Sequence, residues 1–364
     1  MKKELVLFLL ICPLVFFYVF SSQIRKPKVK VHAHLTFEDS FEKLQGIDTE
    51  DWNYIQTRKD FSELERYEEL YEKNKQCQFT AQPLLKIPKT IHLVWLGPNP
   101  FPRKQIENIR SWIAYHPDWS VNFWTDRRRP PPCKGITVRL VQEFEFDFLK
   151  EQFESSRNSA EKADILRYEV LYKEGGLFID YNIRCLRPFH KLHSGYDLFV
   201  CLEMPHEGVD GRSVTAGNAL LGAKKHHPVV KDVITKITEH WNDLGEKHSG
   251  TVPFTQAQKT LTRTFIALSD AMNENLNRYG NTDIVFPACY FFPKHGMTGF
   301  YAEYFHGTTI RGKIPFQMEQ YFAETLIELR KRDTKILKVE LLSLIALLGC
   351  FGLYFLINKQ LKEE

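Results

Sequence analysis

Hydrophobic and polar positions along the middle of the chain follow patterns that predict strands and helices in turn. "KTIHLVWLG", which ends at Gly97, is a buried-strand run that leads into turn residues. "IENIRSWIAYHP" then has helical spacing up to Pro117, and "SVNFWTD" returns to a strand pattern. Strand, helix and strand in this order predict a parallel, doubly wound sheet. The expected fold class is therefore α/β, with a Rossmann-like, mostly parallel sheet flanked by helices.

The segment from Asn158 to Ile183 repeats this arrangement. Asn158, with Glu161 three residues later, marks a helix start, and Gly175-Gly176 marks the helix end. "LFIDYNI" then reads as a strand. Further along, "YDLFVCLEM", "GNALLGA" and "DIVFPACYFFP" are strand-rich, whereas "HPVVKDVITKITEHW" and "AQKTLTRTFIALSDAM" have helical spacing.

Residues 37 to about 76 are highly charged and have a helical pattern. "SELERYEELYEK" places apolar side chains at helical spacing behind a capping box formed by Ser62 and Glu65. We interpret this segment as a charged surface or spacer helix in preference to a partner-binding helix.

Both ends of the chain carry uncharged apolar stretches, Leu5 to Phe20 and Leu341 to Ile357. The first fits either a secretory signal or a retained membrane anchor, and the second fits a transmembrane segment or a buried helix. Basic clusters flank each stretch on the side of the middle domain, so the positive-inside rule places that domain in the cytosol. The Golgi lumen is the alternative. The expected segments are an N-terminal anchor or signal (1–24), a charged helical stem (25–85), the α/β domain (86–316), a basic helical linker (317–338) and a C-terminal transmembrane segment (339–358).

Composition narrows the classes of function. The net charge of +4 is spread along 364 residues, which argues against a nucleic-acid partner. Seven scattered cysteines form no CxxC pair, so a zinc site is not indicated, and no asparagine begins an N-x-S/T acceptor site. These features favour a reducing, unglycosylated compartment.

Four polar residues fall inside otherwise apolar elements. Asp164 and Arg167 are three apart on a predicted helix and share one face, which fits either a simple ion pair or a fixed pair beside a ligand. Asp180 and Asn182 are two apart at the carboxyl end of a predicted strand, the edge where open α/β sheets bind ligands. An acid and a second oxygen there suit a divalent cation that also holds phosphates, although a capped strand-end turn has the same pattern.

Four segments in order resemble a known family. "IPKTIHLVWLG", "SAEKADILRYEVLYKEGGLFIDYNI", "GNALLGAKKHHPVV" and "FPACYFFP" are similar to the glycosyltransferases with a DxD sugar-binding region. This group includes the yeast initiating α-1,6-mannosyltransferase, mannosyl-inositolphosphoceramide synthases and α-1,4-galactosyltransferases. The resemblance covers roughly residues 87 to 311 and excludes both ends. It implies a GT-A fold and a retaining hexosyltransferase that uses a nucleotide-sugar donor, either a UDP-sugar or GDP-mannose.

The resemblance also implies roles for individual residues. Asp164 and Arg167 match a pair that contacts the donor sugar, and Asp180 matches the first acid of DxD, so these three are the expected catalytic residues. Asp180, Asn182 and His306 are the implied ligands for Mn²⁺ or Mg²⁺. The donor-binding residues implied by the resemblance are Trp95, Asp164, Arg167, Asp180, Asn218 and His306.

The chain departs from the family pattern at several positions. The second acid of DxD is Asn182, whose amide oxygen carries no charge, and Thr264-Phe265 stands where a Gly-Pro pair is common. A late Ser-Trp pair after His306 is missing. The expected function is a membrane-anchored glycosyltransferase acting on a glycan or glycolipid acceptor. Two alternatives stay open, an effector-like protein glycosyltransferase and a catalytically silent sugar-nucleotide-binding or scaffold protein.

Overall fold

The computed structural model describes residues 35–80, 84–206, 212–247, 258–294 and 296–304. The described residues from 39 to 304 belong to one compact unit, to which all of the following refers. The two apolar stretches expected at the chain ends, and His306, lie outside the described residues. Across the part that is described, no helix combines the length and the apolar character needed to cross a membrane.

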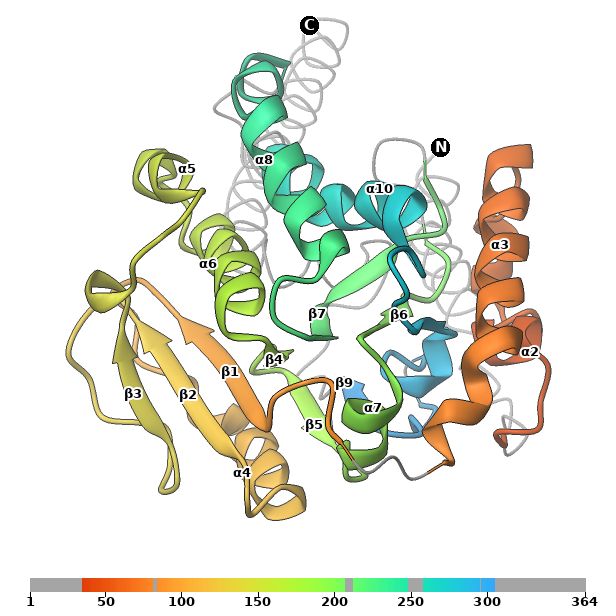
Figure 1. Cartoon of the computed structure of the whole chain (residues 1–364), viewed down its shortest axis with the longest axis horizontal. Coiled ribbons are helices and arrows are strands. Elements are labelled where there is room, and N and C mark those ends of the chain that lie inside the picture. Colours follow the sequence, from red (N-terminus) through yellow and green to blue (C-terminus); the bar gives the residue numbers. More distant parts are fainter. Residues whose placement is uncertain (1–34, 81–83, 207–211, 248–257, 295, 305–364) are drawn as a thin grey trace, which may run out of the picture. The chain divides into compact units, whose positions relative to one another are not determined.

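A seven-stranded sheet forms the centre of the unit, in the order β3-β2-β1-β4-β7-β6-β8 (Figure 1). Strand β7 runs antiparallel to both of its neighbours, and the other pairings are parallel. The predicted α/β class with a mostly parallel sheet is therefore confirmed. The strands are β1 (Thr90–Trp95), β2 (Ser120–Thr125), β3 (Thr137–Leu140), β4 (Gly176–Ile179), β6 (Leu198–Leu202), β7 (Ala216–Ala223) and β8 (Asp283–Phe286), and a two-stranded sheet pairs β5 (Ile183–Cys185) with β9 (Ala302–Tyr304).

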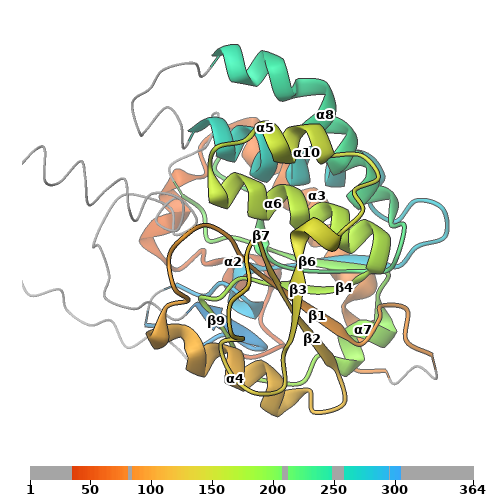
Figure 2. The ribbon, with the colours of Figure 1, turned by 90° about the vertical axis from the view of Figure 1, so that its left-hand side faces the viewer.

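Helices cover both faces of this sheet. Helices α6, α8 and α10 lie together on one face, and α4 lies on the other (Figure 2). The α-helices are α2 (Phe41–Gln45), α3 (Arg58–Asn74), α4 (Ile106–Tyr115), α5 (Lys150–Ser155), α6 (Ser159–Glu174), α7 (His190–Gly195), α8 (Pro228–Lys247) and α10 (Ile266–Asn275). Short helical turns are η1 (Glu50–Tyr54), η2 (Lys75–Gln78), η3 (Arg103–Gln105), η4 (Val141–Glu143), the π-helical η5 (Leu261–Phe265) and η6 (Ala288–Tyr290).

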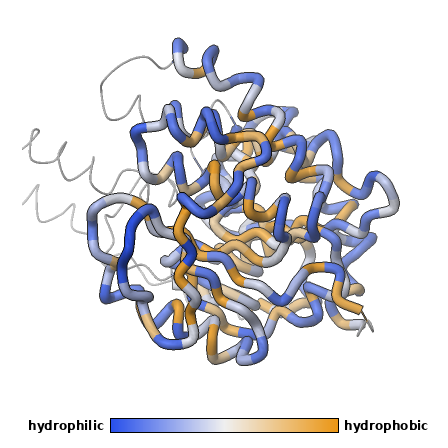
Figure 3. The backbone as a smooth tube through the Cα atoms, turned by 60° about the vertical axis from the view of Figure 1, so that its left-hand side comes forward, coloured by the Kyte–Doolittle hydropathy of each residue, from blue (hydrophilic) through white to orange (hydrophobic). Residues whose placement is uncertain are grey.

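The apolar runs of the sequence become the middle of the sheet. Every residue of β4, β6 and β7 is buried, as expected for strands covered by helices on both faces. The hydropathy-coloured backbone shows these apolar strands enclosed by helices with polar outer positions (Figure 3). Polar residues at the ends of such strands are therefore held by a rigid surrounding.

Helix α3 begins earlier than the sequence pattern predicted. Thr57 is the N-cap, and its side chain and that of Asp60 form a reciprocal capping box, so the predicted box at Ser62 is wrong. The helix packs against the sheet unit, where the Tyr71 hydroxyl lies 2.8 Å from that of Tyr290. The charged segment expected as a stem is thus, from Asp39 onward, part of the same compact unit as the sheet.

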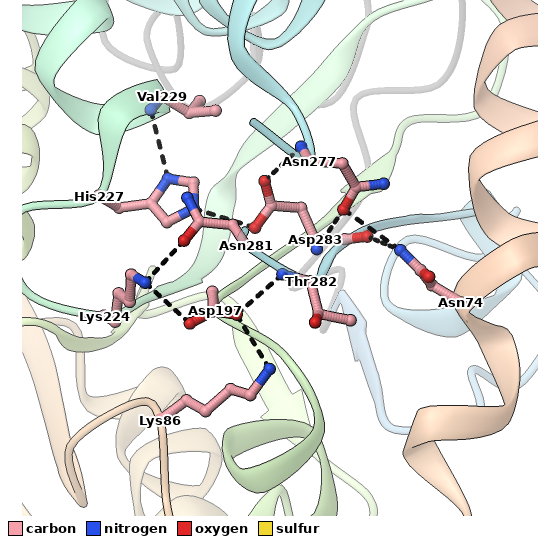
Figure 4. Close-up of polar contacts among 10 residues, drawn as sticks. All are labelled: Asn74, Lys86, Asp197, Lys224, His227, Val229, Asn277, Asn281, Thr282 and Asp283. Atoms are coloured by element: carbon pink, nitrogen blue, oxygen red, sulfur yellow. Dashed lines mark hydrogen bonds and ion pairs between the residues drawn. The ribbon is translucent and has the colours of Figure 1, made fainter. Parts of the chain in front are cut away.

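The amino ends of β6 and β8 are joined by a polar network (Figure 4). Asp197, just before β6, accepts hydrogen bonds from the Thr282 N–H (2.8 Å) and from Lys86 Nζ (2.9 Å), and Lys224 Nζ lies 3.0 Å from its other oxygen. Burial by itself raises the pKa of Asp197, but these donors outweigh it and the net pKa is lowered. The carboxylate therefore stays ionised and ties three loops together at neutral pH.

A neighbouring part of the same network fixes the start of β8. Asp283 is fully buried and lies 2.9 Å from Nε2 of His227, and its other oxygen accepts from the Asn277 N–H at 2.8 Å. Asn74 of α3 donates to the Asp283 carbonyl at 2.7 Å. This polar cluster lies at the sheet edge opposite the carboxyl ends of the parallel strands. We therefore interpret its residues as structural, since they hold the start of β8 in place.

The Gly175-Gly176 step between α6 and β4 is required by geometry. Both residues have positive φ, 65° and 112°. A Cβ on Gly176 would lie 2.6 Å from the Thr90 carbonyl oxygen and 3.1 Å from His92 Nε2. His92 Nε2 lies 2.9 Å from the Gly175 carbonyl, and burial lowers the pKa of His92 to about 4, so the ring is neutral and donates there. The glycines let β4 lie directly beside β1.

We predict that Gly176→Ala lowers the free energy of unfolding by about 2 kcal/mol or more, because a positive-φ penalty and a backbone clash act together. Gly280→Ala is the matched control, since Gly280 also has positive φ (78°) but a Cβ there meets nothing within 4 Å. It should cost only about 1 kcal/mol. Urea denaturation of both variants measures the difference, and equal losses would contradict the account of β4 packing.

Candidate functional site

Helix α6 carries the first two site residues. The Asn158 side chain accepts from the Ala160 N–H at 2.9 Å, so the predicted N-cap is confirmed, and the helix ends at Gly175 as expected. Asp164 and Arg167 are almost completely buried on this helix, with 1% and 2% of their surface exposed. Because an isolated buried charge is costly, both must be paired inside the protein.

Arg167 is the centre of the site. Its Nη2 lies 3.0 Å from Asp164 Oδ1 and 3.0 Å from Asp180 Oδ1, and its Nη1 donates to the Asn218 carbonyl at 2.6 Å. The guanidinium also lies over the Phe178 ring, 4.1 Å from the centroid. One planar fork therefore joins α6, the loop after β4 and strand β7.

Asp164 has two further partners. Thr264 of the π-helical turn donates its hydroxyl to Asp164 Oδ2 at 2.7 Å, and Asn218 Nδ2 lies 3.3 Å from Oδ1. Tyr168 donates to the Thr264 carbonyl at 2.9 Å and so fixes the turn against α6. π-Helical turns often occur at functional sites. Here the turn brings its hydroxyl onto the carboxylate.

Asp180 and Asn182 do not lie on a strand, so that prediction is wrong. Strand β4 ends at Ile179, and the chain turns through residues 180–182 before β5 begins. The Asp180 N–H donates to the Ala219 carbonyl at 2.8 Å, and the Ile183 N–H donates to the Asp180 carbonyl at 3.1 Å. Polar groups that hydrogen-bond locally favour such turns over a continued strand.

This turn holds Asp180 and Asn182 at the carboxyl edge of the sheet as expected. Both residues are 7% exposed. Asp180 points its Oδ1 at Arg167, whereas no hydrogen bond of the Asn182 side chain occurs within the described ranges. The Asn182 amide is therefore a buried donor and acceptor that is available to a ligand.

Trp95 lies next to the same turn. Its ring meets Tyr181 edge-on, with centroids 5.1 Å apart, and meets Phe101 in the same way at 5.5 Å. Asn108 donates to the Tyr181 carbonyl at 3.1 Å and anchors the turn. The three rings are all partly exposed, so they form an aromatic surface beside Asp180.

Acidic side chains gather at this edge of the sheet. Asp164 and Asp180 both pair with the guanidinium of Arg167. Glu203 directly follows β6 at the same edge. Burial, with a smaller contribution from the negative charge of Asp180, raises the pKa of Glu203 to about 8. Carboxyl groups gathered in this way can supply oxygen ligands to a cation.

The donor set fits a divalent cation that is completed by substrate. Mn²⁺ and Mg²⁺ accept one or two carboxylates and take their remaining ligands from phosphates and water. Asp180 and Asn182 offer oxygen ligands of this kind. Among the described residues, no group of three or more His, Cys, Asp or Glu side chains forms an all-protein metal cage. His306, the third expected ligand, lies outside the described residues.

Comparison with known proteins concerns the part of the chain that contains Asp164, Arg167 and Asp180. Residues 102–199 match the model of the "glycosyltransferase sugar-binding region containing DXD motif". The chain carries a DXD-type glycosyltransferase sugar-binding region. This match includes Asp164, Arg167, Asp180 and Asn182, although the motif reads Asp-Tyr-Asn here.

Proteins from two yeasts and a bacterium align with part of the chain. Inositol phosphoceramide mannosyltransferase 3 of Schizosaccharomyces pombe is 29% identical over 151 residues, which is 42% of this chain and 37% of that protein. Mannosyl phosphorylinositol ceramide synthase CSH1 of Saccharomyces cerevisiae is 25% identical over 162 residues, 44% and 38% of the two chains. Subversion of eukaryotic traffic protein A of Legionella pneumophila is 30% identical over 118 residues, 29% and 18%. The aligned part thus spans well under half of each relative's length.

Solved structures show only distant likeness. The PaToxG glycosyltransferase has a TM-score of 0.41 at 16% identity, covering 59% of this chain and 80% of that one. The galactosyltransferase LgtC with donor and acceptor sugar analogues has a TM-score of 0.35 at 11% identity, covering 64% and 94%.

The sequence-predicted residues are largely brought together. Asp164, Arg167, Asp180 and Asn218 form one hydrogen-bonded network, with Asn182 and Trp95 beside it. Sequence reasoning missed Tyr181, Thr264 and Glu203 as members of the site. The middle residue of the motif gave a signal for Tyr181, and the acid that directly follows the apolar run "LFVCL" gave one for Glu203.

We predict that Arg167→Ala lowers the free energy of unfolding by about 3–5 kcal/mol, since it leaves two buried carboxylates without their cation. Arg110→Ala is the control, because its ion pair with Glu107 is solvent-exposed and should change stability by less than about 1 kcal/mol. Thermal and urea unfolding test the pair. A stable Arg167→Ala protein would show that the guanidinium does not hold the site together.

Proposed function

We propose that the protein is a retaining glycosyltransferase of the GT-A type that transfers a hexose from a nucleotide-sugar donor. The observation that carries the proposal is the buried Asp164–Arg167–Asp180 network at the carboxyl edge of a mostly parallel sheet. The matched sugar-binding region supports the same assignment.

The donor lies along this edge in our proposal. Trp95 and Tyr181 offer aromatic faces for the nucleotide base, and Asp180 with Asn182 lies at the diphosphate. Asp180 and Asn182 would hold a divalent cation there, and that cation would offset the negative charge on the departing diphosphate. Because the relatives named above include mannosyltransferases, GDP-mannose is the first donor to test, followed by UDP-sugars.

The site residues act by holding and orienting. Asp164 and Asn218 offer acceptor and donor atoms to sugar hydroxyls, and Arg167 fixes the angle of both carboxylates. In same-face transfer, the bond from the anomeric carbon to the diphosphate oxygen breaks as the bond to the acceptor oxygen forms. The acceptor proton passes to the leaving phosphate oxygen. The oxocarbenium-like transition state resembles that of glycoside hydrolysis.

The acceptor is a glycan or glycolipid at a membrane surface in this proposal. Apolar stretches at both chain ends, flanked by basic residues, would tether the domain on the cytosolic side, with a Golgi-lumen placement as the alternative. A tethered enzyme meets lipid-linked acceptors at high effective concentration.

One observation favours a second candidate function. Asn182 replaces the acid that would otherwise add a second charge at the cation site, and an uncharged ligand binds a divalent cation more weakly. A sugar-nucleotide-binding protein without turnover has the same network. An effector-like transfer to a protein acceptor uses the same donor chemistry and differs only in the molecule that receives the sugar.

A donor panel tests the proposal. Purified protein with Mn²⁺ and either GDP-mannose or a UDP-sugar should hydrolyse or transfer at least one of them, with release of the nucleotide diphosphate as the readout. Asp180→Ala should lower turnover by at least about a hundredfold, and Asn182→Asp should keep or raise it, because a second carboxylate strengthens cation binding.

Two results would count against this function. Binding of a sugar nucleotide without turnover in wild type and in Asn182→Asp supports the silent binding protein instead. Full turnover in folded Asp180→Ala would place the reaction elsewhere in the chain. Glu151 is exposed on α5, so Glu151→Ala serves as the control variant. Its turnover should equal that of wild type.

A further inference from the structure

Glu203 occupies a position at the sheet edge that the proposed mechanism leaves unused. It is the first residue after β6, and its N–H donates to the Thr215 carbonyl at 3.0 Å, directly before β7. Only 6% of its surface is exposed. It therefore lies at the same carboxyl edge as Asp180, which follows β4, with β7 between the two strands.

The two oxygens of the Glu203 carboxyl have different surroundings. Oε1 is buried and has no hydrogen-bond partner within the described residues. Oε2 lies 3.6 Å from Nε2 of His206, and the same nitrogen is 2.9 Å from the Thr215 hydroxyl. Buried polar atoms in folded proteins are nearly always hydrogen-bonded. An unpaired carboxyl oxygen at the carboxyl edge of the sheet therefore indicates that a ligand supplies the missing partner.

The charge state of Glu203 narrows the chemistry of that partner. Burial and the charge of Asp180 raise its pKa to about 8, so the carboxyl is mostly protonated at pH 7. Asp180 is the charged group with a recorded effect on the pKa of Glu203. His206 Nε2 lies beside Oε2, and Glu203 in turn helps to raise the pKa of the Cys201 thiol on β6. A protonated carboxyl both donates and accepts a hydrogen bond, which matches a hydroxyl group. The neighbouring negative charge of Asp180 disfavours a phosphate at this position without a cation.

We propose that Glu203 binds a hydroxyl group of the donor sugar through Oε1, an inference that rests on the proposed function. The strand order supports placing the sugar, and not the nucleotide, of the donor near Glu203. With the base at Trp95, the last residue of β1, and the diphosphate at Asp180 after β4, the remaining part of the donor extends over β7 toward β6. Three strand spacings separate β1 from β6, about 14 Å. Glu203 thus lies at the sugar end of the edge.

The test separates the sugar from the nucleotide. Isothermal titration calorimetry at pH 7 with Mn²⁺ measures the binding of GDP-mannose and of GDP, and of UDP-galactose and UDP, to wild type, Glu203→Ala and Glu203→Gln. For the sugar nucleotide that wild type binds, Glu203→Ala should weaken affinity about tenfold or more, since one buried hydrogen bond is lost. The affinity for the matching bare nucleotide should change less than about threefold. Glu203→Gln should retain most of the sugar-nucleotide affinity, because an amide keeps the shape and both hydrogen-bonding functions of a neutral carboxyl.

The outcomes separate failure of this inference from failure of the proposed function. If wild type binds no nucleotide and no sugar nucleotide, the proposed function fails. If wild type binds a sugar nucleotide but Glu203→Ala weakens both ligands equally, or neither, the role of Glu203 at the sugar is wrong. Loss of sugar-nucleotide affinity in Glu203→Gln equal to that in Glu203→Ala would also overturn it. Melting temperatures of both variants verify that they are folded.

Discussion

The ion pairs of Arg167 are the constraint on which the rest of the site depends. A guanidinium that is 2% exposed can persist only when carboxylates and carbonyls surround it, and here they come from α6, the loop after β4 and strand β7. The position of Asp180 therefore follows from the packing of α6 on the sheet. Gly175 and Gly176 let β4 start close beside β1, and the position of β4 fixes where the loop after it begins.

The acidic residues at this edge connect structure to chemistry. Asp164 and Asp180 both pair with Arg167, and Glu203 follows β6 at the same edge of the sheet. Burial, more than the charge of Asp180, raises the pKa of Glu203 to about 8. A protein that needed only stability would often gain from apolar replacements of such buried ion pairs. We therefore interpret the network as a ligand site.

Much of the architecture could be predicted from the pattern of apolar positions, because strands covered on both faces must be apolar along their whole length. The N-cap at Asn158 and the stop at Gly175 were local signals and were predicted correctly. The capping box was placed one turn too late, since Thr57 and Asp60 lie outside the apolar repeat on which the prediction was based. "LFIDYNI" was read as one strand because its apolar residues continue through the turn at Asp180, where local hydrogen bonds override strand propensity.

The site was only partly readable from the sequence for a related reason. Asp164 and Arg167 lie on one helix and could be paired from their spacing alone. The approach of Thr264, a hundred residues away, depends on a π-helical turn that no spacing rule predicts. Glu203 stands out in the sequence as an acid after an apolar strand, but its closeness to Asp180 requires the strand order β4-β7-β6, which is a property of the folded sheet.

Binding of Mn²⁺ in the presence of GDP, followed by electron paramagnetic resonance, tests the central claim most directly. The account predicts that wild type binds the ion together with the nucleotide, and that Asp180→Asn, which removes the carboxylate charge but keeps the shape, weakens this binding about tenfold or more. Undiminished Mn²⁺ binding by folded Asp180→Asn protein would contradict the claim that the charge held by Arg167 at this sheet edge forms the donor site.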